Sequence, residues 1–198
     1  MKTKESVAAL MPRFTFYVEP SITDQEEKDS VFSAVVESGA VGMEPVVAFM
    51  LNAGSISWPV KILDKIAPQD FVVGNLIALL ESMDIEYQRD PERKNQILTT
   101  LSERKDPRIE AAVVRFLGDM NETVRFNTVA ALSMQDAIAS QSQAIIACLC
   151  TEDSVRVRNR IFDALATAKV SVSPQDEQVK ARLTQNYTLD SNGIPKKK

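Results

Sequence analysis

The sequence predicts an all-α protein: an α-solenoid of about four antiparallel helical hairpins, with an N-terminal extended arm plus helix and a C-terminal capping helix. Two observations lead to this prediction. Apolar triplets with helical spacing recur along the chain, and each is followed by a four-place column of mostly apolar side chains. The columns begin at residues 58, 93, 124 and 157, so their starts are 35, 31 and 33 residues apart. A repeat of that length is typical of stacked helical hairpins.

Residues 1–40 are expected to form the arm and a capping helix. The run 13–18 is rich in aromatic and β-branched residues but alternates only loosely. An isolated strand would have unpaired backbone groups, so an extended arm lying on a helical body is favoured over a strand. Thr23 and Glu26 then form a capping-box pattern that opens a helix to about Ser38, where a glycine ends it.

Residues 41–170 are expected to contain the repeated hairpins. The first helix of each hairpin carries an i, i+3, i+4 apolar triplet, so one face of the helix is apolar. These triplets are Val47, Met50 and Leu51; Leu76, Leu79 and Leu80; Val113, Phe116 and Leu117; and Ile145, Cys148 and Leu149. The columns of the second helices are Trp58, Ile62, Leu63 and Ile66; Arg93, Ile97, Leu98 and Leu101; Val124, Thr128, Val129 and Leu132; and Val157, Ile161, Phe162 and Leu165.

Prolines mark the expected helix starts, because the N–H that proline lacks would be unpaired in a first helical turn. They are Pro59, Pro91, Pro107 and Pro174. Residues 171–198 are expected to form a final helix from about Pro174 to Gln185, which caps the stack. A flexible tail from Asn186 to Lys198 is expected to follow it.

The stretch from Asp119 to Arg125 has family-specific character. An aspartate in the turn between two helices, followed by Val124-Arg125 at the start of the second helix, resembles the HEAT repeat. The resemblance covers roughly residues 41–170 and is clearest over 106–170. The chain as a whole resembles small bacterial HEAT-repeat proteins with a Phe/Tyr-rich N-terminal segment.

In HEAT repeats the turn aspartate and the basic residue form a hydrogen-bonded ladder between neighbouring repeats. Asp119, Arg125 and Arg158 match this pattern, and Lys94 lies in the same column. The chain departs from the pattern elsewhere: Pro59 takes the basic place in the first repeat, and Gln88 and Glu152 replace the turn aspartate in two others. The resemblance therefore implies a structural ladder only in the C-terminal half.

Composition excludes several classes of function. The chain has no histidine, which removes Ser-His-Asp and Cys-His catalysis and the commonest metal ligand. Two cysteines, Cys148 and Cys150, do not make a zinc site by themselves, and the six glycines form no phosphate-binding loop. We expect no enzyme activity, no cofactor and no metal. Without a membrane-length apolar run or a signal sequence, a cytoplasmic location with no membrane contact is expected.

Arg156, Asn159 and Arg160 are the candidate binding residues. They lie on one face of a second helix, and second helices line the concave side of such stacks, where repeat proteins bind extended partners. A protein or peptide partner, an acidic one in particular, would suit the two arginines. The alternative is an ordinary solvated helix face. Two further choices stay open: the aromatic residues between Phe14 and Tyr17 form either a cap or a contact surface, and Trp58 is either core or a binding hot spot.

The leading hypothesis is therefore a non-catalytic protein-binding scaffold or adaptor that uses the concave face of a HEAT-like solenoid. One alternative is an enzyme or enzyme subunit, because a family of HEAT-like chains attaches or removes bilin chromophores; that likeness is at the level of fold. Another alternative is a nucleic-acid-binding helical-repeat protein. Its concave face would need to be basic, whereas this chain has a net charge of −4.

Overall fold

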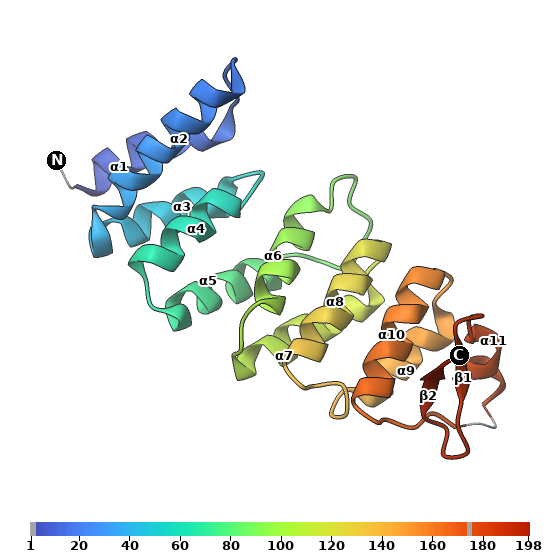
Figure 1. Cartoon of the computed structure of the whole chain (residues 1–198). Coiled ribbons are helices and arrows are strands. Elements are labelled where there is room, and N and C mark those ends of the chain that lie inside the picture. The colour runs from blue at the N-terminus through green and yellow to red at the C-terminus, as the bar shows by residue number, and fades with distance from the viewer. Residues whose placement is uncertain (1–2, 174–175) are drawn as a thin grey trace. The chain divides into compact units, whose positions relative to one another are not determined.

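The protein is all-α in the computed structural model, which describes residues 3–173 and 176–198 (Figure 1). Apart from one short β-hairpin near the C-terminus, the regular elements in the described ranges are α-helices and 3₁₀ helices. This confirms the all-α part of the prediction. Within the same ranges, no single helix is both long enough and apolar enough to cross a membrane.

The chain divides into two compact units, one up to Leu79 and one from Leu80 onward. Unit 1 contains helices arranged in two layers, with α1 packed on α3 and α2 packed on α4. Its elements are α1 (Lys4–Leu10), η1 (Met11–Thr15), α2 (Ser21–Val36), η2 (Gly39–Gly42), α3 (Met43–Asn52) and α4 (Ser57–Ile66). Helix α5 (Gln69–Glu81) contains the boundary between the units.

The extended arm expected at residues 13–18 is wrong in its first half, because residues 13–15 belong to η1 and only residues 16–18 lie outside a helix. Residues 4–15 are helical, and Thr3 starts α1 with a capping box in which its side chain accepts from the Ser6 amide. Val7 and Met11 are buried, α1 packs on α3 and η1 packs on α2, so apolar contacts that are distant in sequence favour the helices. The capping box expected at Thr23 is also wrong. Helix α2 begins two residues earlier, directly after Pro20.

The first apolar triplet is misplaced by one residue in the prediction. Met50 is fully buried, but Leu51 is 49% exposed and Val46 is buried in its stead. Trp58 is half-buried because Phe14 stacks on it, with 4.8 Å between ring centroids. Phe14 therefore covers the apolar face of unit 1, whereas Phe16 and Tyr17 are exposed.

Unit 2 also has two layers. Helices α6 (Glu92–Ser102), α8 (Glu122–Met134) and α10 (Val155–Thr167) lie side by side in one layer (Figure 1). The other layer contains α7 (Pro107–Val113) with η3 (Val114–Gly118), then α9 (Ser142–Thr151) and α11 (Glu177–Arg182). In the predicted columns of the second helices every side chain is buried except Trp58, Ile66 and Arg93, which are half-buried. These buried columns hold α6, α8 and α10 together.

Helices α8 and α10 begin at turns that supply their own side-chain caps, whereas α6 begins after Pro91 without one. Asn121 accepts from the amides of Thr123 and Val124 at the start of α8, and Ser154 accepts from the Val157 amide at the start of α10. Asp106 caps α7 before Pro107, as predicted. Each cap satisfies N–H groups that have no partner inside the helix.

The C-terminal tail is ordered, which corrects the expectation of a flexible segment. Strands β1 (Tyr187–Leu189) and β2 (Pro195–Lys197) pair in an antiparallel hairpin, and β2 packs on α10. Gly193 in the turn has a φ of 79°, a conformation that glycine adopts without strain. Tyr187 is buried against Phe162, which holds the hairpin on the helix. Pro174, the expected start of the last helix, lies outside the described residues.

Candidate functional site

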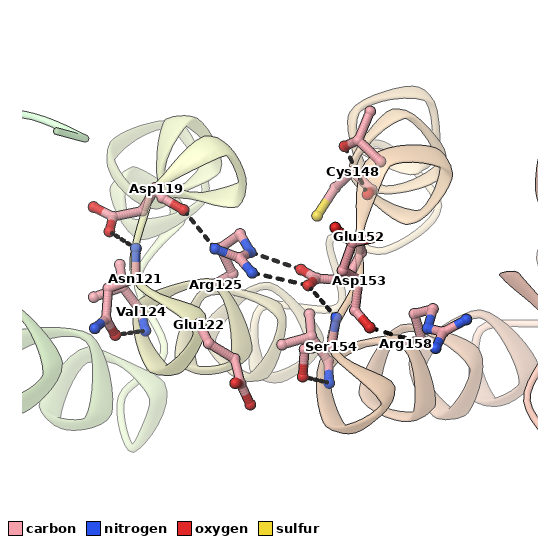
Figure 2. A network of polar contacts seen from close by, with 12 residues as sticks. Asp119, Asn121, Glu122, Val124, Arg125, Cys148, Glu152, Asp153, Ser154 and Arg158 are labelled. Carbon is pink, nitrogen blue, oxygen red and sulfur yellow. Dashed lines mark hydrogen bonds and ion pairs between the residues drawn. The ribbon is translucent and has the colours of Figure 1, made fainter. Parts of the chain in front are cut away.

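Arg125 joins two successive turns of unit 2. Its Nε and Nη2 donate to the two carboxylate oxygens of Glu152 at 2.6 and 2.8 Å, and its Nη1 donates to the carbonyl of Asp119 at 2.8 Å (Figure 2). Glu152 Oε1 also accepts from the Ser154 amide at 2.8 Å. Arg125 therefore fixes the turn before α10 to the start of α8 through a bidentate pair, the strongest geometry that an arginine and a carboxylate can adopt.

Lys94 repeats this arrangement one helix earlier. Its Nζ lies 2.6 Å from Asp119 Oδ2 and 2.7 Å from the carbonyl of Asp84. Asp119 Oδ1 accepts from the Asn121 amide, so this carboxylate also shapes the turn before α8. In both cases a base on one second helix pairs with the acid in the following turn. Glu152 thus acts as the acidic partner in the turn, although the HEAT pattern has an aspartate at this position.

Arg158 occupies the third place in this series and has no carboxylate partner among the described residues. It donates to the carbonyls of Arg182 and Asp153, at 3.2 and 3.4 Å. Its Nε is buried without a hydrogen-bond partner in the described part of the chain. The next acidic turn is replaced here by the C-terminal segment that follows α11. The series of base–acid pairs thus ends at Arg158, which contacts backbone instead.

The pKa shifts around the Arg125–Glu152 pair are those expected of a structural ion pair. Burial alone would raise the pKa of Glu152, but hydrogen bonds from Arg125 and the Ser154 amide outweigh it, and the pKa falls below its ordinary value. The hydrogen bond with Glu152 raises the pKa of Arg125. Burial raises the pKa of the neighbouring Cys148 thiol to about 11. A thiol that stays protonated at neutral pH is a poor nucleophile.

The three candidate binding residues lie on α10, where Arg156 is exposed and Asn159 and Arg160 are half-buried. The guanidinium carbons of Arg156 and Arg160 are 4.1 and 5.6 Å from the centre of the same ring, that of Phe126. Arg156 also lies 3.7 Å from Glu122, in a pair whose side chains are 51% and 46% exposed. We call Phe126, Arg156, Asn159 and Arg160 the α8–α10 surface. It is cationic, with an aromatic centre.

Asn159 has a different role from its two arginine neighbours. Its side-chain oxygen accepts from the Thr184 hydroxyl at 2.7 Å, so it ties α10 to the C-terminal segment. Of the three predicted binding residues, the structure therefore brings Arg156 and Arg160 together over one ring. Asn159 lies on the same helix but is occupied by an internal contact.

A surface pocket of about 450 Å³ adjoins Arg160. Ser133, Asp136, Ile138, Ala139, Asp163, Ala164, Thr167 and Ala168 complete its lining. Asp163 in this lining accepts from Lys197 Nζ at 2.8 Å and from the Tyr187 hydroxyl. Burial would raise the pKa of Asp163, yet the contacts with Lys197 and Tyr187 lower it. The pocket thus has an apolar wall and one arginine whose Nε has no hydrogen-bond partner among the described residues.

Sequence reasoning missed Phe126, the central residue of this surface. Its place in the repeat was visible: Phe126 lies 31 residues after Asn95 and 33 before Asn159, so one outward-facing column contains two asparagines and an aromatic ring. The hairpin residues Tyr187 and Lys197 lie outside the repeats, in the segment expected to be a tail, so no repeat spacing indicated them.

The described residues contain no group of three or more Cys, Asp or Glu side chains placed to hold a metal ion. Arginines over an aromatic ring bind carboxylates and aromatic side chains through charge-assisted hydrogen bonds and stacking. Comparison with protein-family models, with curated proteins and with solved structures finds no match for this chain.

Proposed function

We propose that this chain is a non-catalytic protein-binding module, built as a HEAT-like α-solenoid, whose contact face includes the α8–α10 surface. The packing within each unit supports the architecture. Unit 1 places α1 on α3 and α2 on α4, and unit 2 places α6, α8 and α10 in series. The pairs Lys94–Asp119 and Arg125–Glu152 link consecutive hairpins in the way that a HEAT ladder does.

The functional part of the proposal is carried by one observation: Arg156, which is exposed, and Arg160, which is half-buried, share one aromatic ring. Neither Arg156 nor Arg160 is needed for the pairs that hold the hairpins together, because Lys94 and Arg125 make those pairs. Contact with the Phe126 ring restricts both guanidinium groups. The two arginines therefore lose less conformational entropy when a partner binds than flexible lysines would.

The partner class follows from this chemistry. A segment of a protein rich in Asp or Glu would offer carboxylates to Arg156 and Arg160, and an aromatic or apolar side chain would contact Phe126. Aromatic residues and arginine are the residue types that contribute most to protein interfaces. A specific interface buries about 800 Å² on each partner, and three neighbouring helices of this length provide an area of that order.

Photo-crosslinking tests the proposal directly. Phe126 is replaced by p-benzoylphenylalanine, which keeps an aromatic ring in place, and crosslinked proteins are identified in the native cell. We expect a defined crosslinked protein whose yield falls about tenfold or more in Arg156→Gln/Arg160→Gln. The matched control, Lys169→Gln/Lys180→Gln, removes two exposed charges elsewhere and should leave the yield unchanged. Equal crosslinking in both variants would contradict the proposal.

A further inference from the structure

The loop that joins η1 to α2, together with the first turn of α2, presents three large apolar side chains to solvent. Phe16 is 51% exposed, Tyr17 56% and Ile22 71%. They lie within seven consecutive residues, which we call the aromatic loop (residues 16–22). Phe14, two residues before it, stacks on Trp58 and covers the core of unit 1. Phe14 thus covers the core, and the exposed side chains of the aromatic loop do not take part in this.

A cluster of buried charges holds the aromatic loop in one conformation. Arg13 donates to Glu27 at 2.9 Å, to Asp24 Oδ1 at 2.8 Å and to the carbonyl of Phe16 at 3.1 Å. Asp24 Oδ1 also accepts from the Val18 amide, and Asp24 Oδ2 pairs with Lys28 at 2.7 Å. The side chains of Arg13 and Asp24 are only 11% and 7% exposed. The backbone on both sides of Tyr17 is therefore fixed.

The cation side chains also orient the exposed rings. Arg13 lies 4.6 Å from the centre of the Phe16 ring, and Lys28 lies 5.9 Å from that of Tyr17. Burying an ion cluster costs desolvation free energy, so it is weak support for stability by itself. Its structural result here is a rigid loop with aromatic side chains directed to solvent. Rigid aromatic side chains lose little entropy on binding and dominate the energetics of protein interfaces.

Charge restricts what this loop binds. Between residues 13 and 29 there are two basic and five acidic side chains, and Glu19 lies within the loop itself. Two such loops facing each other would bring like charges together. The same net negative charge disfavours an anionic lipid surface. An acidic, aromatic loop instead complements a cationic surface with an aromatic centre and an adjoining pocket.

Such a surface exists on this chain. We propose that the aromatic loop of one copy docks on the α8–α10 surface of a second copy, with Glu19 facing Arg156 and Arg160. An apolar side chain of the loop would then enter the pocket of about 450 Å³ beside Arg160, against Ile138 and Ala164. This inference rests on the proposed function of the α8–α10 surface and names a second copy of the chain as its partner.

The contact uses two different surfaces, so it is heterologous. Each copy keeps one free surface of each kind after docking, and association continues beyond a dimer unless a ring closes. Three apolar side chains and one carboxylate make an interface smaller than the standard size. We expect a dissociation constant on the order of 100 µM. Salt should weaken the association, because it screens the exposed charges.

Sedimentation velocity on the full chain, from about 10 µM to about 1 mM, tests the proposal. We expect the wild type to form dimers and larger species as concentration rises. Phe16→Ser/Tyr17→Ser and Arg156→Gln/Arg160→Gln should each weaken the association about tenfold or more. Two matched controls should not: Tyr87→Ser/Met120→Ser removes exposed apolar side chains elsewhere, and Lys169→Gln/Lys180→Gln removes charges elsewhere. Circular dichroism melts verify that every variant is folded.

Mixing the two interface variants gives the decisive result. The loop variant retains its arginines and the arginine variant retains its loop, so a mixture should form a 1:1 dimer and nothing larger. A monomeric wild type at about 1 mM would overturn the inference. Undiminished association of the arginine variant alone would overturn it too, since the loop would then bind a site other than the α8–α10 surface. So would a monomeric wild type that sediments with phosphatidylcholine vesicles through its loop.

The two experiments separate the absence of docking between copies from the absence of partner binding at the α8–α10 surface. If the wild type is monomeric but crosslinks from position 126 to another protein disappear in Arg156→Gln/Arg160→Gln, the α8–α10 surface binds a different partner. If copies associate through the aromatic loop while the arginine variant is unaffected, the receptor lies elsewhere. Each result identifies which of the two surfaces was wrongly assigned.

Discussion

Lys94 and Asp119 form an ion pair that is closed to solvent. The Nζ and Oδ2 atoms are 2.6 Å apart, and each side chain is 1% exposed. Both groups have further partners, since Lys94 donates to the carbonyl of Asp84 and Asp119 accepts from the Asn121 amide. The pair connects α6 to the turn before α8, across 25 positions of sequence. Its loss would therefore affect two hairpins at once.

Lys94→Met should destabilise unit 2 by about 3–5 kcal/mol, because it leaves the buried Asp119 carboxylate without its counter-charge. Urea unfolding followed by circular dichroism measures the loss. Lys105→Met is the matched control: Lys105 pairs with Asp136, but their side chains are 59% and 84% exposed. That control should change the free energy of unfolding by less than about 1 kcal/mol. Equal effects of the two substitutions would mean that the Lys94 pair is not buried.

The Arg125–Glu152 pair should make stability depend on pH in the acid range. The folded state lowers the pKa of Glu152 below its ordinary value of 4.5. A lowered pKa means that this contribution is complete above the unfolded-state value and is lost as pH falls through the folded-state value. Glu152→Gln should reduce stability at neutral pH by about 1.5–3 kcal/mol, the range for hydrogen bonds to charged groups.

The same variant should show a flatter loss of stability between about pH 5 and pH 3 than the wild type. Arg125→Met should behave similarly, since it removes the partner that lowers the pKa. Denaturant midpoints measured at a series of pH values provide the comparison. Parallel curves for wild type and Glu152→Gln would show that this pair does not contribute to acid sensitivity.

Leu132→Ala should cost about 2–5 kcal/mol, because Leu132 is fully buried in the column between α6 and α10. Leu51→Ala provides the contrast. Leu51 is 49% exposed on α3, although its place in an apolar triplet suggested a core position. Its truncation should change the free energy of unfolding by about 0.5 kcal/mol or less. Similar losses at both positions would contradict the burial pattern.

Cys148 should react slowly with alkylating reagents. Burial raises its pKa to about 11, so only about one thiol in a thousand is ionised at about pH 8. In a Cys150→Ala background, alkylation by iodoacetamide should be at least about tenfold slower than in urea, where the thiol is exposed. Mass spectrometry of timed samples gives the rate. A rate equal to that of the unfolded chain would mean that Cys148 is accessible.

Local patterns in the sequence predict the helices of unit 2 well. Leu101, Leu132 and Leu165 are all fully buried, because a helix returns to the same face every 3.6 residues and the columns follow that period. The start of α7 at Asp106 and Pro107 was predictable for the same reason, since a cap and its proline act within one turn. Such features depend on neighbours in the chain alone.

Other features were not predictable because packing decided them. Residues 4–15 are helical because Val7 and Met11 are buried where α1 and η1 pack on α3 and α2, respectively, and no local signal indicates those contacts. The C-terminal segment is ordered because Tyr187 packs on Phe162 and hydrogen-bonds Asp163. The Asn192-Gly193 turn is a local hairpin signal, but a hairpin this short is stable only when it packs on another element.

The sequence by itself determined the all-α class, the apolar columns and the lack of histidine chemistry, since these follow from composition and short-range periodicity. The tertiary structure decided which partner each charged side chain contacts. Arg125 pairs with Glu152, Lys94 with Asp119, and Arg158 with backbone carbonyls, although all three bases occupy equivalent sequence positions. It also brought Phe126 beneath Arg156 and Arg160. The physical reason is that contacts across 24 to 34 residues depend on how helices pack, and helical periodicity does not encode that packing.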